Sequence, residues 1–165
     1  MRLKRKGALV MAMVFFLLPA ISHSAEYHQK EALKGLKGVE VVVEDLKPEA
    51  EHMGLSTAQI KTDVELRLRK AGIKVLTFAE SAFTPGMPYL HVTVTEMNSL
   101  SLIVFSLEVD LKERVTLDRG FKVPGKIWST SSVGAVGINK IREIRVFIGD
   151  DVDKFINDYL AANPK

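Results

Sequence analysis

The alternation of apolar and polar residues predicts five strands and two helices in the chain. A strand is predicted at 38–46, because Val39, Val41 and Val43 share one face and Val42 adds burial on the other. The strict alternation in YLHVTVTEM and in the long stretch that follows it is typical of antiparallel strands with one buried face. The five predicted strands cover 38–46, 73–78, 89–97, 103–117 and 126–137. On the longest of them, only Glu113 interrupts the apolar side.

The first predicted helix has a start signal and a stop signal. Ser56 stands at the N-cap position with Gln59 in the spacing of a capping box. An apolar stripe follows at helical intervals, and Gly72 is placed to end the helix in the left-handed conformation. The stripe consists of Ile60, Val64, Leu68 and Ala71. Opposite charges four residues apart predict pairs on the wet side at Lys61–Glu65, Asp63–Arg67 and Glu65–Arg69.

The second predicted helix begins at Asn139, a suitable N-cap residue, and ends before Asn163-Pro164. Its apolar stripe consists of Ile141, Ile144, Ile148, Val152, Phe155, Ile156, Tyr159 and Leu160. Gly149 interrupts this helix at a cost of about 1 kcal/mol relative to alanine and predicts a bend.

The predicted order of elements is therefore β-α-β-β-β-β-α. Two helices with one apolar stripe each need a sheet face to cover, so we predict a two-layer α+β sandwich. The sheet is expected to be mostly antiparallel, with both helices on one face. The first strand, the helix and the strand at 73–78 predict a right-handed parallel crossover.

The first 25 residues have the composition of a secretory signal peptide. A basic start precedes the apolar run ALVMAMVFFLL, and small residues follow Pro19. Cleavage after Ser24 and cleavage after Ala25 both remain open, as does an uncleaved anchor, although the run is shorter than the roughly 20 residues that span a bilayer. The predicted organisation is a signal peptide at 1–25, a polar lead-in at 26–37 and a single α+β domain at 38–165.

Removal of this segment changes the charge of the chain. The whole chain has 23 basic and 20 acidic residues, and residues 1–25 contain four basic and no acidic ones, so the exported part is 19 − 20 = −1. A basic patch for nucleic acid is therefore not expected. The absence of cysteine excludes disulfides, thiolate metal sites, cysteine nucleophiles and a lipid anchor on cysteine.

Two stretches resemble binding motifs without completing them. GFKVPGKI, at 120–127, has the spacing of a phosphate-binding loop but ends in Ile127 where Ser or Thr would bind Mg²⁺, and a strand follows it. Gly120, Pro124 and Gly125 are instead expected to be turn residues between two strands. The acids of GDDVDKF lack calcium-loop spacing, so Asp150, Asp151 and Asp153 are expected on the wet side of the last helix.

No catalytic, cofactor-binding or metal-binding residue is predicted. The three histidines of the exported part lack zinc-ligand spacing, and His91 is expected to be a solvated residue on the outer face of its strand. The serines at 129–132 have no nucleophile elbow around them.

The start of the longest strand is apolar on both sides, which is unusual for a half-exposed strand. Leu100, Leu102 and Val104 lie opposite its buried face. One interpretation is that this end packs beneath a loop or the polar lead-in. The other is that it forms an exposed patch for a partner, or a strand edge open to β-addition.

Several stretches resemble a group of small exported bacterial proteins with no assigned activity. They are DVELRLRKAGIKVL, YLHVTV, IWST and the closing DKFINDYLAANPK. The order of elements is also similar to envelope accessory domains, such as the amino-terminal domain of the Tol–Pal translocation protein and the auxiliary lipoproteins of lipid transporters. The chain departs from the latter in lacking their lipid-bearing cysteine.

The sequence therefore predicts a periplasmic or secreted, non-enzymatic accessory domain of the bacterial envelope. Its expected partner is an envelope protein or component, with no nucleic acid, nucleotide or cofactor, and with no membrane span once the signal is removed. The oligomeric state is left open. The alternative is a small exported hydrolase or ligand carrier, which would need converging polar groups that include His52, His91 or the serines at 129–132.

Overall fold

A computed structural model describes residues 28–99 and 101–164 and shows an α+β fold. Four strands form one sheet in the order β1-β2-β3-β4, and helical segments accompany them. The strands are β1 (Glu40–Val43), β2 (Tyr89–Ser99), β3 (Leu102–Thr116) and β4 (Lys122–Gly137). The helices are α2 (Pro48–His52), α3 (Thr57–Lys70), α4 (Phe78–Phe83), the 3-10 helix η1 (Ile138–Glu143) and α5 (Ile144–Ala162). The predicted signal peptide and its cleavage sites lie outside the described residues.

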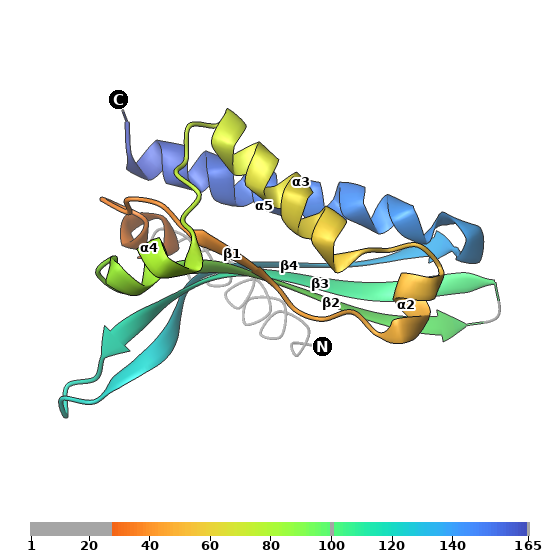
Figure 1. Ribbon diagram of the computed structural model, residues 1–165, viewed down its shortest axis with the longest axis horizontal. Coiled ribbons are helices and arrows are strands. Elements are labelled where there is room, and N and C mark those ends of the chain that lie inside the picture. Colours follow the sequence, from red (N-terminus) through yellow and green to blue (C-terminus); the bar gives the residue numbers. More distant parts are fainter. Residues whose placement is uncertain (1–27, 100, 165) are drawn as a thin grey trace, which may run out of the picture.

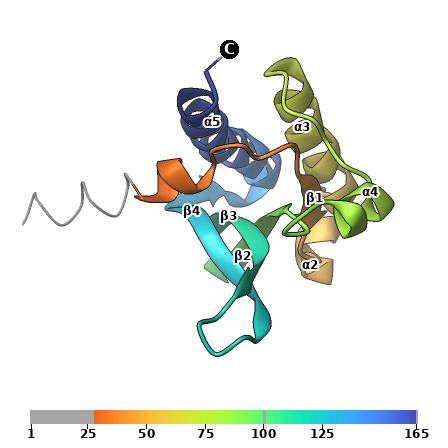
Figure 2. The same cartoon turned by 90° about the vertical axis from the view of Figure 1, so that its left-hand side faces the viewer.

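The two long helices, α3 and α5, lie side by side over the same face of the sheet, and the core fills the space between the layers (Figures 1 and 2). The buried stripe of α3 consists of Ile60, Val64 and Leu68, as predicted. The inward side chains of β2 and β3 meet it with valines, leucines and Phe105, which is 1% exposed. The alternation of the strands and the helical stripes therefore bury one shared apolar layer.

The predicted topology is only partly right, because the sheet is mixed. β2 pairs antiparallel with β3, and β3 antiparallel with β4, but β1 runs parallel to β2. The predicted strand at 73–78 is reduced to one parallel bridge between Val39 and Val75. After the helix, the chain therefore returns to the outer side of β1, as expected, but it forms no full strand there.

The strand at 73–78 stops because a helix begins at once. Thr77 caps α4: its hydroxyl accepts a hydrogen bond from the Glu80 amide at 3.2 Å, and the Glu80 carboxylate accepts one from the Thr77 amide at 2.9 Å. This is a complete capping box. The apolar letters of IKVLTF suggested a strand, whereas the Thr-x-x-Glu spacing that follows them was the better signal.

The cap of α4 makes a testable pH prediction. Hydrogen bonds from the Thr77 amide, from Lys74 and from the Thr77 hydroxyl lower the pKa of Glu80 to about 2. A depressed acid pKa stabilises the fold above the ordinary value of 4.5, and this contribution is lost as the pH falls through about 2. An NMR titration should find the Glu80 midpoint near 2, and Thr77→Ala should move it toward 4.5. Because Thr77→Ala retains the backbone amide and Lys74, a Glu80 midpoint that it leaves unchanged would show that the Thr77 hydroxyl does not lower this pKa.

The ends of α3 agree with the sequence, whereas two of its three predicted charge pairs do not. The Ser56 hydroxyl accepts from the Gln59 amide at 3.4 Å, and Gly72, at φ +80°, ends the helix in the left-handed conformation. Of the predicted pairs, only Arg69–Glu65 forms, at 2.8 Å. Asp63 and Arg67 form ion pairs with Arg145 and Asp153 of α5 instead of with each other.

The last helix begins later than expected. A 3-10 turn, η1, occupies the predicted first turn and kinks at Lys140, and α5 starts after Glu143. Asn139 is therefore not the N-cap. The apolar stripe is buried as predicted from Ile141 to Ile156, but Leu160 is 39% exposed.

The stretch that resembles a phosphate-binding loop is part of the β3–β4 hairpin. Gly120 lies in the turn at φ +85°, where the Leu117 amide donates to the Phe121 carbonyl at 2.8 Å. The sequence suggested that Pro124 and Gly125 are turn residues, and this prediction is wrong. They lie within β4 and pair with β3. The prediction that a strand follows this stretch is confirmed, since β4 continues to Gly137.

Candidate binding surface on the open face of the sheet

The sheet has a second face, which α3 and α5 do not cover (Figure 2). Successive side chains of a strand alternate between the two faces, so the strand residues between the core positions point to this open face. On β2, β3 and β4 they fall into two groups. Apolar residues gather toward the β2–β3 turn, and charged residues gather toward the other end of the strands.

The apolar group spans three strands in register. Met97 pairs with Val104, and Val104 pairs with Ala135 on the next strand. Leu102 and Val133 flank this row. The exposed fractions are high: 67% for Met97, 47% for Leu102 and 78% for Val133. We call Met97, Leu102, Val104, Val133 and Ala135 the apolar patch.

Two of the three predicted contact residues, Leu102 and Val104, belong to the apolar patch, and Leu100 lies outside the described residues. The described part of the lead-in does not cover them. It lies against the middle of β4, where the Gln29 side chain accepts a hydrogen bond from the Ser129 amide at 3.2 Å. The sequence missed Met97 and Val133, because neither stands out before the register of the three strands is known.

The patch borders an edge of the sheet with which no other strand of the described residues pairs. β4 is the last strand of the sheet, and the Ser129 amide points away from β3 toward Gln29. Backbone groups of an antiparallel strand point alternately toward and away from the partner. The pairing with β3 is regular from Trp128 to Gly137, so the backbone of Ser131, Val133 and Ala135 also points outward. These three residues are exposed. The segment 129–137 has no charged residue and no proline to block pairing.

The charged group consists of side chains that pair with one another. Lys126 contacts both Glu108 and Asp110, and its Nζ lies 3.0 Å from Asp110 Oδ1. Hydrogen bonding to Glu108 and then to Asp110 raises the pKa of Lys126, and the same Lys126 bond lowers the pKa of Glu108. Lys112 Nζ lies 3.9 Å from Asp110 Oδ2. These charged side chains therefore neutralise one another on the surface of the sheet.

His91 belongs to this network and is not the freely solvated residue that the sequence suggested. Its Nδ1 lies 3.1 Å from Lys112 Nζ, and its Nε2 lies 3.9 Å from Glu44 Oε2. Partial burial and then the positive charge of Lys112 lower the pKa of His91, which favours the neutral ring. Within residues 28–99 and 101–164, no group of three or more potential metal ligands assembles.

The serine cluster and the acids of α5 meet in a way that the sequence did not predict. Asp151 of α5 faces the sheet and is 1% exposed, so the expectation that it lies on the wet side is wrong, whereas its neighbour Asp150 is exposed. The Ser132 hydroxyl donates to Asp151 Oδ2 at 2.6 Å, and Lys154 Nζ donates to Oδ1 at 2.7 Å. The Ser132 hydrogen bond joins β4 to α5 beneath the helix, and the Lys154 hydrogen bond lies within α5.

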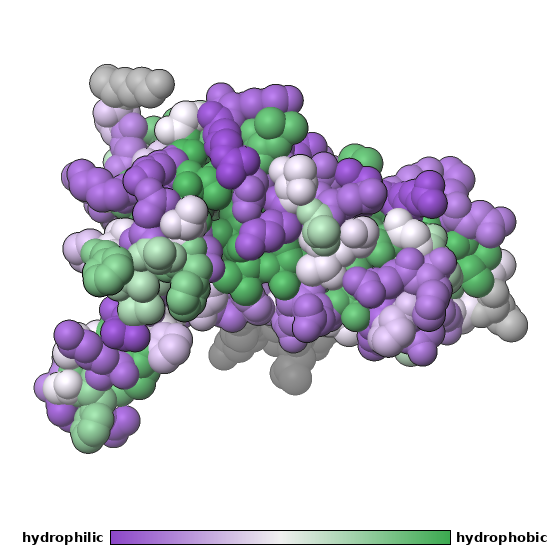
Figure 3. Space-filling model, viewed as in Figure 1, coloured by the Kyte–Doolittle hydropathy of each residue, from purple (hydrophilic) through white to green (hydrophobic). Residues whose placement is uncertain are grey.

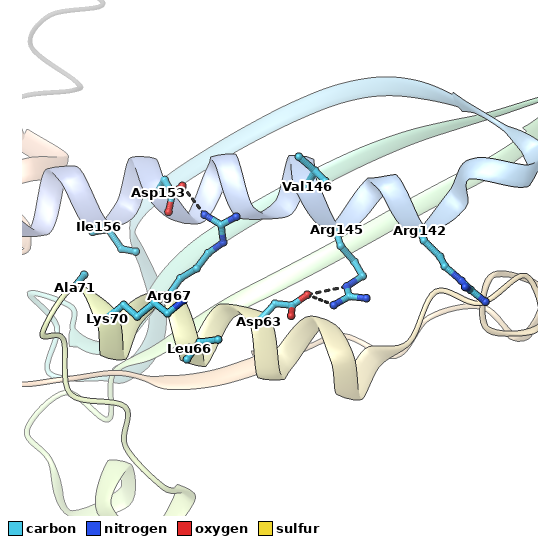
Figure 4. Close-up of a pocket in the computed structure, with 10 residues that line it drawn as sticks. All are labelled: Asp63, Leu66, Arg67, Lys70, Ala71, Arg142, Arg145, Val146, Asp153 and Ile156. Atoms are coloured by element: carbon cyan, nitrogen blue, oxygen red, sulfur yellow. Dashed lines mark hydrogen bonds and ion pairs between the residues drawn. The ribbon is translucent and has the colours of Figure 1, made fainter.

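A groove of about 800 Å³ separates α3 from α5 on the outer side of the molecule (Figure 4). Arg67 crosses to Asp153 at 2.6 Å, and Arg145 crosses back to Asp63 at 2.6 Å. Gly149 makes the first crossing possible, since a Cβ at this position would lie 2.4 Å from the Arg67 guanidinium. Gly149 therefore marks a helix contact, and α5 continues through it without the predicted bend. The groove is bridged by its own ion pairs.

Comparisons with known proteins give no further guide to the family. No protein-family model matches the chain, and no curated protein shows significant sequence similarity to it. The resemblance to small exported proteins therefore stays a prediction. None of the helices in the described residues is both long enough and apolar enough to cross a membrane.

Proposed function

We propose that the protein is an exported, non-enzymatic accessory domain of the bacterial envelope that binds another envelope protein through the free edge of β4. The observation that carries this proposal is the junction of that edge with the apolar patch. The edge offers unpaired backbone groups to an added strand, and the patch offers apolar contacts to its side chains. Export to the periplasm or the medium rests on the composition of the first 25 residues.

The chemistry of the edge favours an extended polypeptide as the partner. A strand added to β4 would find outward backbone groups at Ser131, Val133 and Ala135, and one face of that strand would lie beside the exposed Val133 side chain. Affinity would come from backbone hydrogen bonds, and selectivity from alternate side chains. The expected partner is therefore a segment with apolar residues at every second position.

Site-specific photocrosslinking in intact cells tests this function. A photoreactive residue at Met97 or Val133 is expected to give one discrete adduct with another envelope protein. Matched controls at the exposed positions Lys61 and Asn157, on the helical side, should give none. The same adducts from both sides of the molecule, or adducts that contain only a second copy of this chain, would overturn the proposed partner.

A substitution in the apolar patch provides a second test of the same contact. Val133→Ser is expected to abolish the Met97 adduct while the free energy of unfolding stays within about 0.5 kcal/mol, because the side chain is exposed. Urea denaturation measures the latter. An adduct that survives Val133→Ser would place the contact elsewhere.

Export is tested independently by mass spectrometry of the protein from fractionated cells. The mature chain is expected to begin at Ala25 or Glu26, according to which cleavage occurs. A cytosolic protein that retains Met1 would overturn the envelope assignment and leave the β4 contact to be judged separately.

A further inference from the structure

A separate cavity of about 280 Å³ lies beneath α4, at the end of the sheet away from the apolar patch. Phe78 of α4 lines it, and Phe78 and Phe83 are the most exposed phenylalanines among the described residues. Phe78 is 76% exposed and Phe83 is 90% exposed, and Figure 3 shows apolar residues gathered over α4. The cavity is lined by Glu40, Val42, Phe78, Ser81, Met87, Tyr89, Glu113, Arg114 and Pro124.

The walls come from α4, from the loop that follows it and from all four strands, which the topology brings together. Parallel pairing aligns Glu40 of β1 with Tyr89 of β2, so the starts of both strands form one side. Pro124 pairs with Arg114 across the β3–β4 hairpin and forms another. Most of the lining is apolar, as in sites that bind small molecules.

One wall carries a carboxylate that has no partner. Glu113 is the residue that interrupts the apolar side of the longest strand, and in the structure it is half-buried. Among the described residues it forms no hydrogen bond and no ion pair, and burial raises the pKa of its carboxyl group. A half-buried carboxylate in an apolar site is stabilised when a cation or hydrogen-bond donor meets it.

The loop that follows α4 is shaped around this carboxylate. Gly86 lies at φ +82°, and a Cβ at this position would come within 2.9 Å of Glu113 Oε2. The Gly86 carbonyl accepts a hydrogen bond from the Arg114 amide at 2.6 Å, which fixes the loop against β3. The close passage of Gly86 therefore leaves room for the Glu113 side chain at the cavity wall.

We propose that this cavity binds a small amphiphile with an apolar body and one protonated amine. The amine pairs with the Glu113 carboxylate, while the apolar body packs against Val42, Met87 and Pro124. The ring of Tyr89 offers its face or edge to the same ligand. Two carboxylates and one guanidinium line the cavity, so its charge balance favours a cation over an anion. This function is distinct from strand addition at β4 and does not depend on it.

Isothermal titration of the purified chain with three probes of equal length tests the ligand class. Octylammonium is expected to bind with one-to-one stoichiometry, and octanoate is expected to bind at least tenfold more weakly. Octan-1-ol should fall between them, because it keeps the apolar contacts without the charge. Equal binding of octylammonium and octanoate to the unmodified chain, or no binding of any probe, would overturn the proposal.

The role of Glu113 is tested by substitution with a matched control. Glu113→Gln is expected to weaken octylammonium binding about tenfold or more, since the ammonium then meets a neutral amide oxygen instead of a carboxylate. Asp118→Asn removes the same charge from the exposed hairpin turn and should leave the affinity unchanged. Circular dichroism checks that both variants fold. Equal affinities of the two variants would overturn the assignment of the amine to Glu113, and Val133→Ser should not alter octylammonium binding.

Discussion

Asp151→Ala is expected to lower the free energy of unfolding by about 1–3 kcal/mol more than Asp150→Ala does. Asp151 is 1% exposed and accepts hydrogen bonds from Ser132 at 2.6 Å and from Lys154 at 2.7 Å. Its removal leaves the Ser132 hydroxyl without this acceptor beneath α5. Lys154 is half-exposed and turns to water, which limits the loss.

Asp150 is a suitable control because it is the neighbour of Asp151 in the same helix. Asp150 is exposed, and both substitutions gain the same helix propensity and remove the same charge. The difference between the two midpoints of urea denaturation, at unchanged slope, therefore isolates the buried contacts. Equal destabilisation by the two variants would show that the Ser132–Asp151–Lys154 group does not hold α5 on the sheet.

Gly134→Ala is expected to lower the free energy of unfolding by about 1–3 kcal/mol through overpacking. A Cβ at Gly134 would lie 2.5 Å from Cζ of the Phe105 ring. Phe105 is 1% exposed and packs on Phe147, with ring centroids 5.2 Å apart, so its ring has little room to withdraw. Thermal or urea denaturation measures the loss.

Gly137→Ala is the matched control for this prediction. It lies three residues further along β4, and its Cβ would meet only the Lys140 side chain, at an ordinary distance of 3.7 Å. Both substitutions reduce the freedom of the unfolded chain equally. If Gly134→Ala is no more destabilising than Gly137→Ala, the ring of Phe105 can move aside and the close approach is not required.

The parts of the fold that the sequence predicted well are those fixed by local periodicity. The buried stripe of α3, its Ser56 cap and its Gly72 stop are all properties of one helix and its neighbours in the chain. The alternation of β2 and β3 likewise separated their core face from the open face. The small residues of β4 include Gly134, against which the ring of Phe105 packs closely.

The parts that the sequence did not predict depend on partners distant in the chain. Asp151 lies three residues after Ile148 and four before Phe155, so helical spacing already placed it on the buried side of α5. Its hydrogen-bond partner Ser132 belongs to β4 and could not be identified from the sequence. Arg67 has a suitable partner four residues away in Asp63 but bonds to Asp153 of α5. The parallel alignment of β1 with β2 is also a property of the assembled sheet.

The two candidate sites show the same division. Leu102 and Val104 stood out from the sequence because they are apolar at positions where the alternation of the strand calls for polar residues. Met97 and Val133 join them only through the register of three strands. Glu113 was noticed as an interruption of an apolar stripe. Its cavity could not be foreseen, because the walls come from α4 and β1, which the sequence analysis had missed or paired differently.

The parallel pairing of β1 with β2 also affects the order in which the strands are expected to fold. β2, β3 and β4 follow one another as hairpins, so their contacts close short loops. β1 meets β2 only after α2, α3 and α4 have been traversed, and its opposite side has a single bridge to Val75. Closing that long loop costs entropy before any ladder bond is gained. The three-stranded meander is therefore the natural folding nucleus, onto which β1 docks late and from which it is the first strand to detach.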